Sequence, residues 1–342
     1  MKLEWTETGK IKSCVFHEEA VSFRQDDYGG PAWQCRLGEE LRTSTTPRYR
    51  EGWFKEAFFG VELRYRFQTE GDSLIIEAEA ENQSSQTMPL DQLGLRIGLD
   101  CAMESYPQWD TVFVPTLLRC EKTYFWGFLS SPLGRRLGIY SPDPIASWHL
   151  DYNRFFADGG HRIMTFCLDF LQSGKLPDRH PQSQPLKPWE TRRWRIEIAE
   201  LAPEQTVPSW LAEKGVPVFA GERWSAECRS PLEFELLSRT EPTLMAEGRP
   251  VPCLLKKSGV YTVRLESDQP RELRLTVSNG KHQSEAWVQF IHPWRTIMEE
   301  AARQSLSQPQ KMGTHCESWY GLFTGAAAIL HHLDFDCAAY LE

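Results

Sequence analysis

Three short segments of the sequence combine aromatic rings with side chains that donate or accept hydrogen bonds. They are residues 106–110 (YPQWD), 148–154 (WHLDYNR) and 313–321 (GTHCESWYG). A flat aromatic ring can stack on the apolar C–H face of a sugar, while carboxylate, amide and basic groups satisfy the hydroxyls at its rim. The residue types of these segments are therefore those of a sugar-binding site.

In each of the first two segments the candidate binding residues are one tryptophan and one aspartate. They are Trp109 with Asp110, and Trp148 with Asp151. We expect the indole to act as a platform and the carboxylate to bind hydroxyl groups. The alternative is that these tryptophans pack in the core or at the edge of a large sheet.

The third segment is the strongest local combination. His315 and Glu317 can transfer protons or bind a sugar, and Trp319 and Tyr320 can serve as platforms. Burying His315 and Glu317 without partners would cost several kcal/mol, so we expect this segment to line a cleft on a rigid scaffold. The alternative is a structural loop that contains a buried tryptophan.

Several other classes of site and partner are disfavoured. The histidines and cysteines match no closed zinc pattern, and the nucleotide-binding and hydrolase motifs GxxxxGK, GxGxxG, GxSxG and HExxH are absent from the sequence. We therefore predict no metal and no cofactor. The net charge of −9 argues against nucleic acid and anionic membranes as partners, and no apolar run approaches the ~18 residues of a membrane helix.

The cysteines and the first residues bear on location. Nine cysteines are scattered without a CxxC pair, which fits reduced thiols. The opening MKLEWTETGK has no apolar core of a secretory signal. We therefore expect a cytoplasmic protein.

Alternating apolar and polar residues predict that the candidate residues lie among short strands. Residues 61–67 (VELRYRF) and 74–82 (LIIEAEAEN) read as a hairpin. The further predicted strands are residues 93–99, 124–129, 137–140, 163–170 and 193–198. We therefore predict a mainly β fold whose first domain, residues 1–202, is a large antiparallel sandwich or supersandwich.

The remainder of the chain predicts two more parts. Residues 203–211 read as a proline-containing linker that opens a second domain, 203–292, whose strands recur about every ten residues as in a small Ig-like sandwich. From 293 to 342 the pattern turns helical, which we interpret as the start of a truncated helical domain. In its first helix, Trp294 and a stripe containing Ile297 are expected to pack against the β domains.

This order of parts resembles carbohydrate-active enzymes in which an N-terminal supersandwich precedes an (α/α)-toroid. Several glycoside hydrolases have this order, and polysaccharide lyases use related parts; no single family is identified. The resemblance implies a catalytic toroid downstream on the same polypeptide. It also implies that residues 313–321 line its pocket, with Glu317 as the general acid.

We therefore expect the chain to be the N-terminal, non-catalytic part of a glycoside hydrolase that acts on oligosaccharides or polysaccharide fragments. Carbohydrate would be its ligand, and the downstream helical domain its intramolecular partner. Two alternatives stay open. One is a non-enzymatic module that binds carbohydrate or protein, and the other is a polysaccharide lyase.

Overall fold

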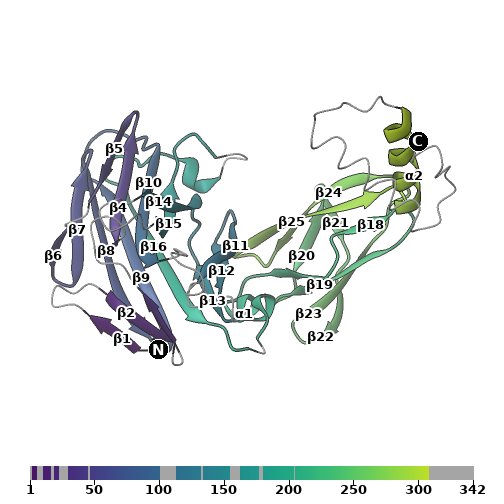
Figure 1. The fold of residues 1–342 in the computed structure, drawn as a ribbon, viewed down its shortest axis with the longest axis horizontal. Helices are drawn as coiled ribbons and strands as arrows, with labels where there is room; N and C mark the ends of the chain where they lie inside the picture. The colour runs from purple at the N-terminus through teal and green to yellow at the C-terminus, as the bar shows by residue number, and fades with distance from the viewer. Residues whose placement is uncertain are drawn as a thin grey trace. The chain divides into compact units, whose positions relative to one another are not determined.

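The computed structural model describes most of the chain, in ten segments. They are residues 2–5, 11–16, 19–22, 30–44, 47–100, 113–131, 134–154, 162–176, 180–203 and 205–307. The chain divides into two compact units, the first comprising Met1–Pro217 and Ser278–Ser284, the second Val218–Val277 and Glu285–Glu342. The predicted mainly β fold is confirmed, because the described residues form several antiparallel sheets with only short helices (Figure 1).

The described part of the first unit contains three sheets. The smallest has the order β1 (Lys2–Trp5), β2 (Ile11–Phe16) and β3 (Glu19–Ser22). The second has the order β14 (Ser147–Arg154), β15 (Arg162–Leu171), β10 (Gln92–Asp100), β4 (Ala32–Leu37) and β5 (Glu40–Thr43). The largest has the order β11 (Val114–Cys120), β12 (Phe125–Ser130), β13 (Arg136–Ser141), β16 (Thr191–Glu200), β9 (Ser73–Asn82), β8 (Val61–Glu70), β7 (Trp53–Phe58) and β6 (Arg48–Arg50).

The hairpin of β8 and β9 shows why these sequences form strands. Every second residue of β8 from Val61 to Phe67 is buried, and the intervening residues are partly exposed. The exposed faces of the two strands carry ion pairs, among them Arg66 with Glu77. One face is thus apolar and the other charged, as the period of two residues predicts.

The two larger sheets of the first unit face each other across one core. Trp33 of β4 lies 6.3 Å from Tyr65 of β8 between ring centroids, and Phe170 of β15 stacks on Trp194 of β16 at 4.5 Å. These four rings are buried, and apolar residues of both sheets surround them. The two sheets therefore form the large sandwich that the sequence predicts.

The second unit is a smaller sandwich. One sheet has the order β17 (Val218–Ala220), β19 (Leu232–Leu237), β23 (Val260–Leu265) and β22 (Leu254–Lys257). The other has the order β18 (Ser225–Glu227), β25 (Gln283–Ile291), β24 (Arg271–Ser278), β20 (Thr243–Ala246) and β21 (Arg249–Val251). Both sheets contribute to its core, which includes Phe234, Val263, Leu275 and Phe290.

The segment predicted as a proline-containing linker forms a short helix instead. Helix α1 (Val207–Glu213) begins after Thr206, whose hydroxyl accepts a hydrogen bond from the backbone of Ser209 at 3.2 Å. Pro208 lies in the first turn, where its missing N–H costs nothing. Trp210 is buried and lies edge-on to Tyr140, 6.4 Å away. Burial of this tryptophan stabilises a helix too short to be stable alone.

The predicted helix after Pro293 is confirmed as α2 (Trp294–Ser307). Its Ile297 lines a hollow together with residues of β24 and β25, so this part of the predicted stripe faces the sheet. Trp294, however, is 59% exposed, so more than half of this residue is open to solvent. Its backbone N–H donates to Glu227 at 3.0 Å. An acceptor at this position satisfies one of the free N–H groups of the first helical turn.

Replacing Phe170 by alanine should destabilise the first unit by about 3–5 kcal/mol, because it removes a fully buried ring from the stack with Trp194. Urea unfolding followed by near-ultraviolet circular dichroism measures the change. The matched control is Leu117→Ala in the same unit, whose side chain is exposed and should cost less than about 1 kcal/mol. Equal losses in the two variants would contradict the proposed core.

Candidate functional site

Most of the residues predicted as a site from the sequence lie outside the described part of the chain. They are Trp109, Asp110, His315, Glu317, Trp319 and Tyr320. Their roles therefore stay predictions. Trp148 and Asp151 are described, and both lie in β14.

Trp148 and Asp151 point to opposite faces of their sheet. Trp148 pairs with Leu168 of β15, and its ring packs toward the core, 6.3 Å from the ring of Phe166. Asp151 pairs with Thr165, three residues along the strand and therefore on the other face. The structure thus does not bring the two into one site, and the role of Trp148 as a sugar platform stays a prediction.

Asp151 belongs to a set of polar side chains on the face of the five-stranded sheet that points away from the sandwich core. The strand register places these residues together: Gly94 pairs with both Gln34 and Asp169, and Cys167 pairs with both Arg96 and His149. We call this set the polar layer. Its members are Gln34, Arg96, His149, Asp151 and Asp169.

Arg96 and Asp151 form the first half of the polar layer. Arg96 is only 3% exposed; its Nη1 lies 3.2 Å from Oδ2 of Asp151, and its Nε donates to the carbonyl of Gly30 at 2.7 Å. Gln34 donates to the same carboxylate oxygen at 2.9 Å. A buried guanidinium is tolerated only with such partners, so Asp151 holds Arg96 in place while remaining partly exposed itself.

His149 and Asp169 form the second half. Nδ1 of His149 lies 3.0 Å from Oδ2 of Asp169, which also accepts from the hydroxyl of Ser147 at 2.8 Å. The other oxygen of Asp169 accepts from Gln92 at 2.8 Å. The hydrogen bond to Asp169 raises the pKa of His149, against the opposing effect of burial. The buried carboxylate thus fixes the ring and favours its protonated form.

Gly94 makes room for the carboxylate of Asp169. A Cβ at position 94 would lie 2.6 Å from Oδ1 of Asp169 and 3.1 Å from the carbonyl of Leu168. The first of these contacts is sterically impossible, so the carboxylate of Asp169 would have to move. Glycine in the middle of β10 is therefore a packing requirement of the polar layer.

The polar layer can bind groups that present hydroxyls or carboxylates. About a third of the His149 side chain is exposed, and Asp151 is partly exposed, whereas Arg96 and Asp169 are buried behind them. A histidine held by a carboxylate at Nδ1 keeps Nε2, on the opposite edge of the ring, for a ligand or a proton transfer. The buried pair therefore orients the two side chains that reach solvent.

Sequence reasoning found the segment of His149 and Asp151 but missed Gln34, Arg96 and Asp169. The partners of Asp151 lie 117 and 55 residues away in the chain, and only the pairing of strands brings them together. One signal was present in the sequence: Arg96 is the single charge in the otherwise apolar strand LGLRIGL. A lone charge in a buried strand requires a partner.

Two further properties apply to the described residues alone. In that part of the chain, no three side chains of histidine, cysteine, aspartate or glutamate gather closely enough to hold a metal ion. No described helix combines the length and the apolar character that a membrane span requires.

Comparison with known proteins gives a match in structure but not in sequence. No protein-family model matches the chain, and no curated protein matches it. Eighteen chains of solved structures match its fold. One of them is a polysaccharide lyase, with a TM-score of 0.67 and 16% sequence identity, over 92% of this chain and 49% of the lyase. At this identity the likeness concerns the fold, and this chain spans about half the length of the lyase.

Asp151→Ala should destabilise the first unit by about 3 kcal/mol, because it removes the carboxylate that pairs with the buried Arg96 at 3.2 Å. Urea unfolding measures the loss. The matched control is Glu40→Ala in the same sheet, which removes an exposed ion pair with Arg42 and should cost less than about 1 kcal/mol. A loss for Asp151→Ala as small as that of the control would contradict the structural role of the pair.

His149→Gln should remove a stabilising contribution that depends on pH. Because Asp169 raises the folded-state pKa of His149 above its ordinary value of about 6.5, this contribution is fully present below about pH 6.5. It is lost as the pH rises through the raised pKa. The difference in unfolding free energy between wild type and variant should therefore be largest in acid and shrink toward alkaline pH.

Two other histidines also make the stability of the protein depend on pH, so the unfolding free energies of wild type and His149→Gln must be compared at each pH. Burial lowers the pKa of His180 and of His282, so their contributions have the opposite sign and are lost as the pH falls. Both remain in His149→Gln, and their effects cancel in the difference. A difference that stays constant with pH, or grows toward alkaline pH, would show that protonation of His149 beside Asp169 does not stabilise the fold.

Proposed function

We propose that this chain forms the β part of a carbohydrate-active enzyme that cleaves a polysaccharide. The observation that carries the proposal is the fold match to a polysaccharide lyase over 92% of this chain. Since the chain spans 49% of that lyase, the proposed enzyme completes its active site with residues outside this chain. The role of the β units is to hold and orient the glycan.

The polar layer supports a carbohydrate ligand. Its exposed members, His149 and Asp151, can donate to and accept from hydroxyl groups, and buried partners fix both side chains. Fixed hydrogen-bonding groups suit a sugar ligand, because these protein side chains lose little conformational entropy when the sugar binds. The raised pKa of His149 also favours a cation that can pair with an acidic sugar.

The fold match favours elimination over the hydrolysis predicted from the sequence. In elimination, a base removes the proton next to the carboxylate of a uronic acid, and the bond to the leaving sugar oxygen breaks. That oxygen takes up a proton, and a carbon–carbon double bond remains in the new chain end. In hydrolysis, water adds across the broken bond and no double bond forms. The two chemistries therefore leave different products.

The test uses the natural gene product that contains this chain, together with the 342-residue chain alone. Both are incubated with uronate-containing polysaccharides and with neutral ones. Release of reducing ends and ultraviolet absorbance of unsaturated ends are followed together. We expect unsaturated ends from a uronate-containing polysaccharide with the natural product, and binding without cleavage by the 342-residue chain.

Each other outcome has a defined meaning. Reducing ends without unsaturation would replace the lyase with a hydrolase. Cleavage by the 342-residue chain alone would contradict an active site completed elsewhere. Glycan binding without cleavage by the natural product would favour a non-enzymatic binding module. Absence of both binding and cleavage for every polysaccharide would contradict the carbohydrate function itself.

A further inference from the structure

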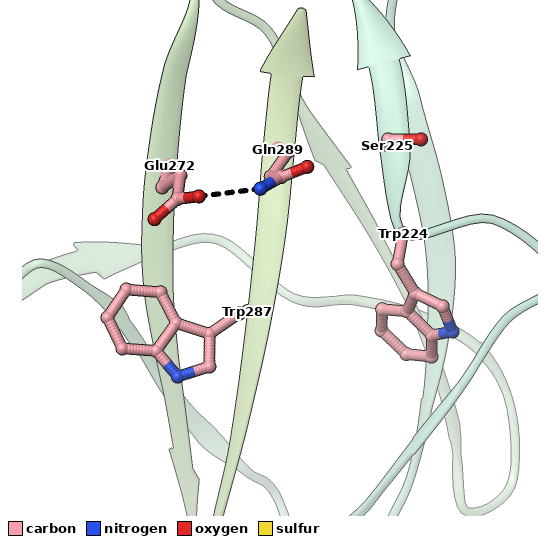
Figure 2. Close-up of a pocket in the computed structure, with 5 residues that line it drawn as sticks. All are labelled: Trp224, Ser225, Glu272, Trp287 and Gln289. Atoms are coloured by element: carbon pink, nitrogen blue, oxygen red, sulfur yellow. Dashed lines mark hydrogen bonds between the residues drawn. The ribbon is translucent and has the colours of Figure 1, made fainter. Parts of the chain in front are cut away.

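An open hollow of about 300 Å³ lies on the outer face of the second unit. Its lining residues come from β18, β24, β25 and the residue before β18, and Figure 2 shows them together. They are Trp224, Ser225, Glu272, Trp287 and Gln289. We call it the tryptophan hollow; the sequence predicted none of its residues as a site.

Trp287 is a large apolar side chain on the solvent side of a strand. In β25 the residues Val288 and Phe290 are buried in the core, so the strand period places Trp287 and Gln289 on the outer face. Trp287 is 59% exposed there. A tryptophan on this outer face is not packed in the core, and tryptophan is enriched among the residues that contribute most to binding.

Trp224 lines the same hollow and is fixed by backbone and ring contacts. The backbone N–H of Gln289 donates to the carbonyl of Trp224 at 3.0 Å, next to the parallel pairing of β18 with β25. The indole contacts the rings of Phe219 and Phe234, with centroids 6.3 and 5.9 Å away, yet 37% of Trp224 remains exposed. It is therefore a rigid platform, anchored in the core on one side and open on the other.

A polar pair accompanies the two indoles. Nε2 of Gln289 donates to Glu272 at 2.6 Å, and in Figure 2 this pair bridges β24 and β25 at a point further along the strands from the ring of Trp287. A carboxylate and an amide each have further acceptor positions beyond this one bond. Exposed aromatic faces beside fixed acceptors match a sugar, whose ring has an apolar face and a rim of hydroxyl donors.

A second hollow of about 400 Å³ adjoins the first. The two share Glu272 and Gln289, and the second extends to Arg271, His292 and Ile297. The shared pair thus lies at the junction of two adjoining spaces. This arrangement suits a linear chain of at least two sugar residues better than a single compact ligand.

We propose that the tryptophan hollow binds one sugar residue of a linear oligosaccharide and that the adjoining hollow binds the next. The carboxylate of Glu272 disfavours an anionic sugar at the indoles, so the residue stacked there is neutral. The site is separate from the polar layer. The class of ligand rests on the proposed function, whereas the location rests on the tryptophan hollow itself.

The test measures binding of the 342-residue chain to an array of defined neutral and uronate-containing oligosaccharides, followed by calorimetric titration with the best binder. Trp287→Ala should weaken the affinity about tenfold, as loss of a central aromatic anchor does. Trp287→Phe should retain most of it. The matched control is Trp189→Ala, which removes a 63% exposed tryptophan of the first unit and should leave binding unchanged.

The outcomes separate this proposal from the proposed function. If oligosaccharides bind and Trp287→Ala binds as well as wild type, the tryptophan hollow is not the site, while the carbohydrate function stands. If no oligosaccharide binds to the 342-residue chain, the tryptophan hollow is not a sugar site, and the proposed function is then decided by the cleavage assay with the natural gene product. Sedimentation of the same proteins tests a different occupant, because an oligomer that Trp287→Ala dissociates would assign this face to self-association and overturn the proposal. Circular dichroism confirms that the variants are folded.

Discussion

Four buried aromatic rings lie in the core between the two large sheets of the first unit. Stacked sheets lie about 10 Å apart, and only large side chains fill that gap without voids. Because side chains alternate along a strand, each residue that points into this core fixes the direction of its neighbours. Trp33 and Phe170 point inward, so Gln34 and Asp169 point outward into the polar layer. The position of the candidate site thus follows from the packing of the core.

Local patterns in the sequence predict well where the strands are, but they do not predict which strands pair with one another in a sheet. The alternation in residues 61–82 gives the β8–β9 hairpin directly, because its turn is short and its register is local. The order of strands in the five-stranded sheet involves pairing of β10 with both β4 and β15, which no local pattern contains. The prolines near residue 207 suggested a linker, yet the capping hydroxyl of Thr206 and the buried Trp210 stabilise a helix.

The candidate sites also depend on strand pairing that local sequence patterns do not contain. Composition drew attention to Asp151, but its partner Arg96 comes from another strand, so the buried ion pair could not be predicted. Trp287 carried a readable signal, because in SEAWVQFI the residues Ala286, Val288 and Phe290 share one face and the tryptophan falls on the other. Composition marks segments rich in suitable residue types, whereas a site requires residues that the sheet brings together.

The most direct measurement is a crystal structure of the chain with an oligosaccharide that it binds. We expect ordered sugar residues against the exposed indole of Trp287, or hydrogen-bonded to His149 and Asp151 in the polar layer, or at both places. At both surfaces, polar side chains with fixed hydrogen-bond partners reach solvent. Sugar density that lies away from both surfaces at saturating concentration would contradict the assignment of these β units to glycan binding.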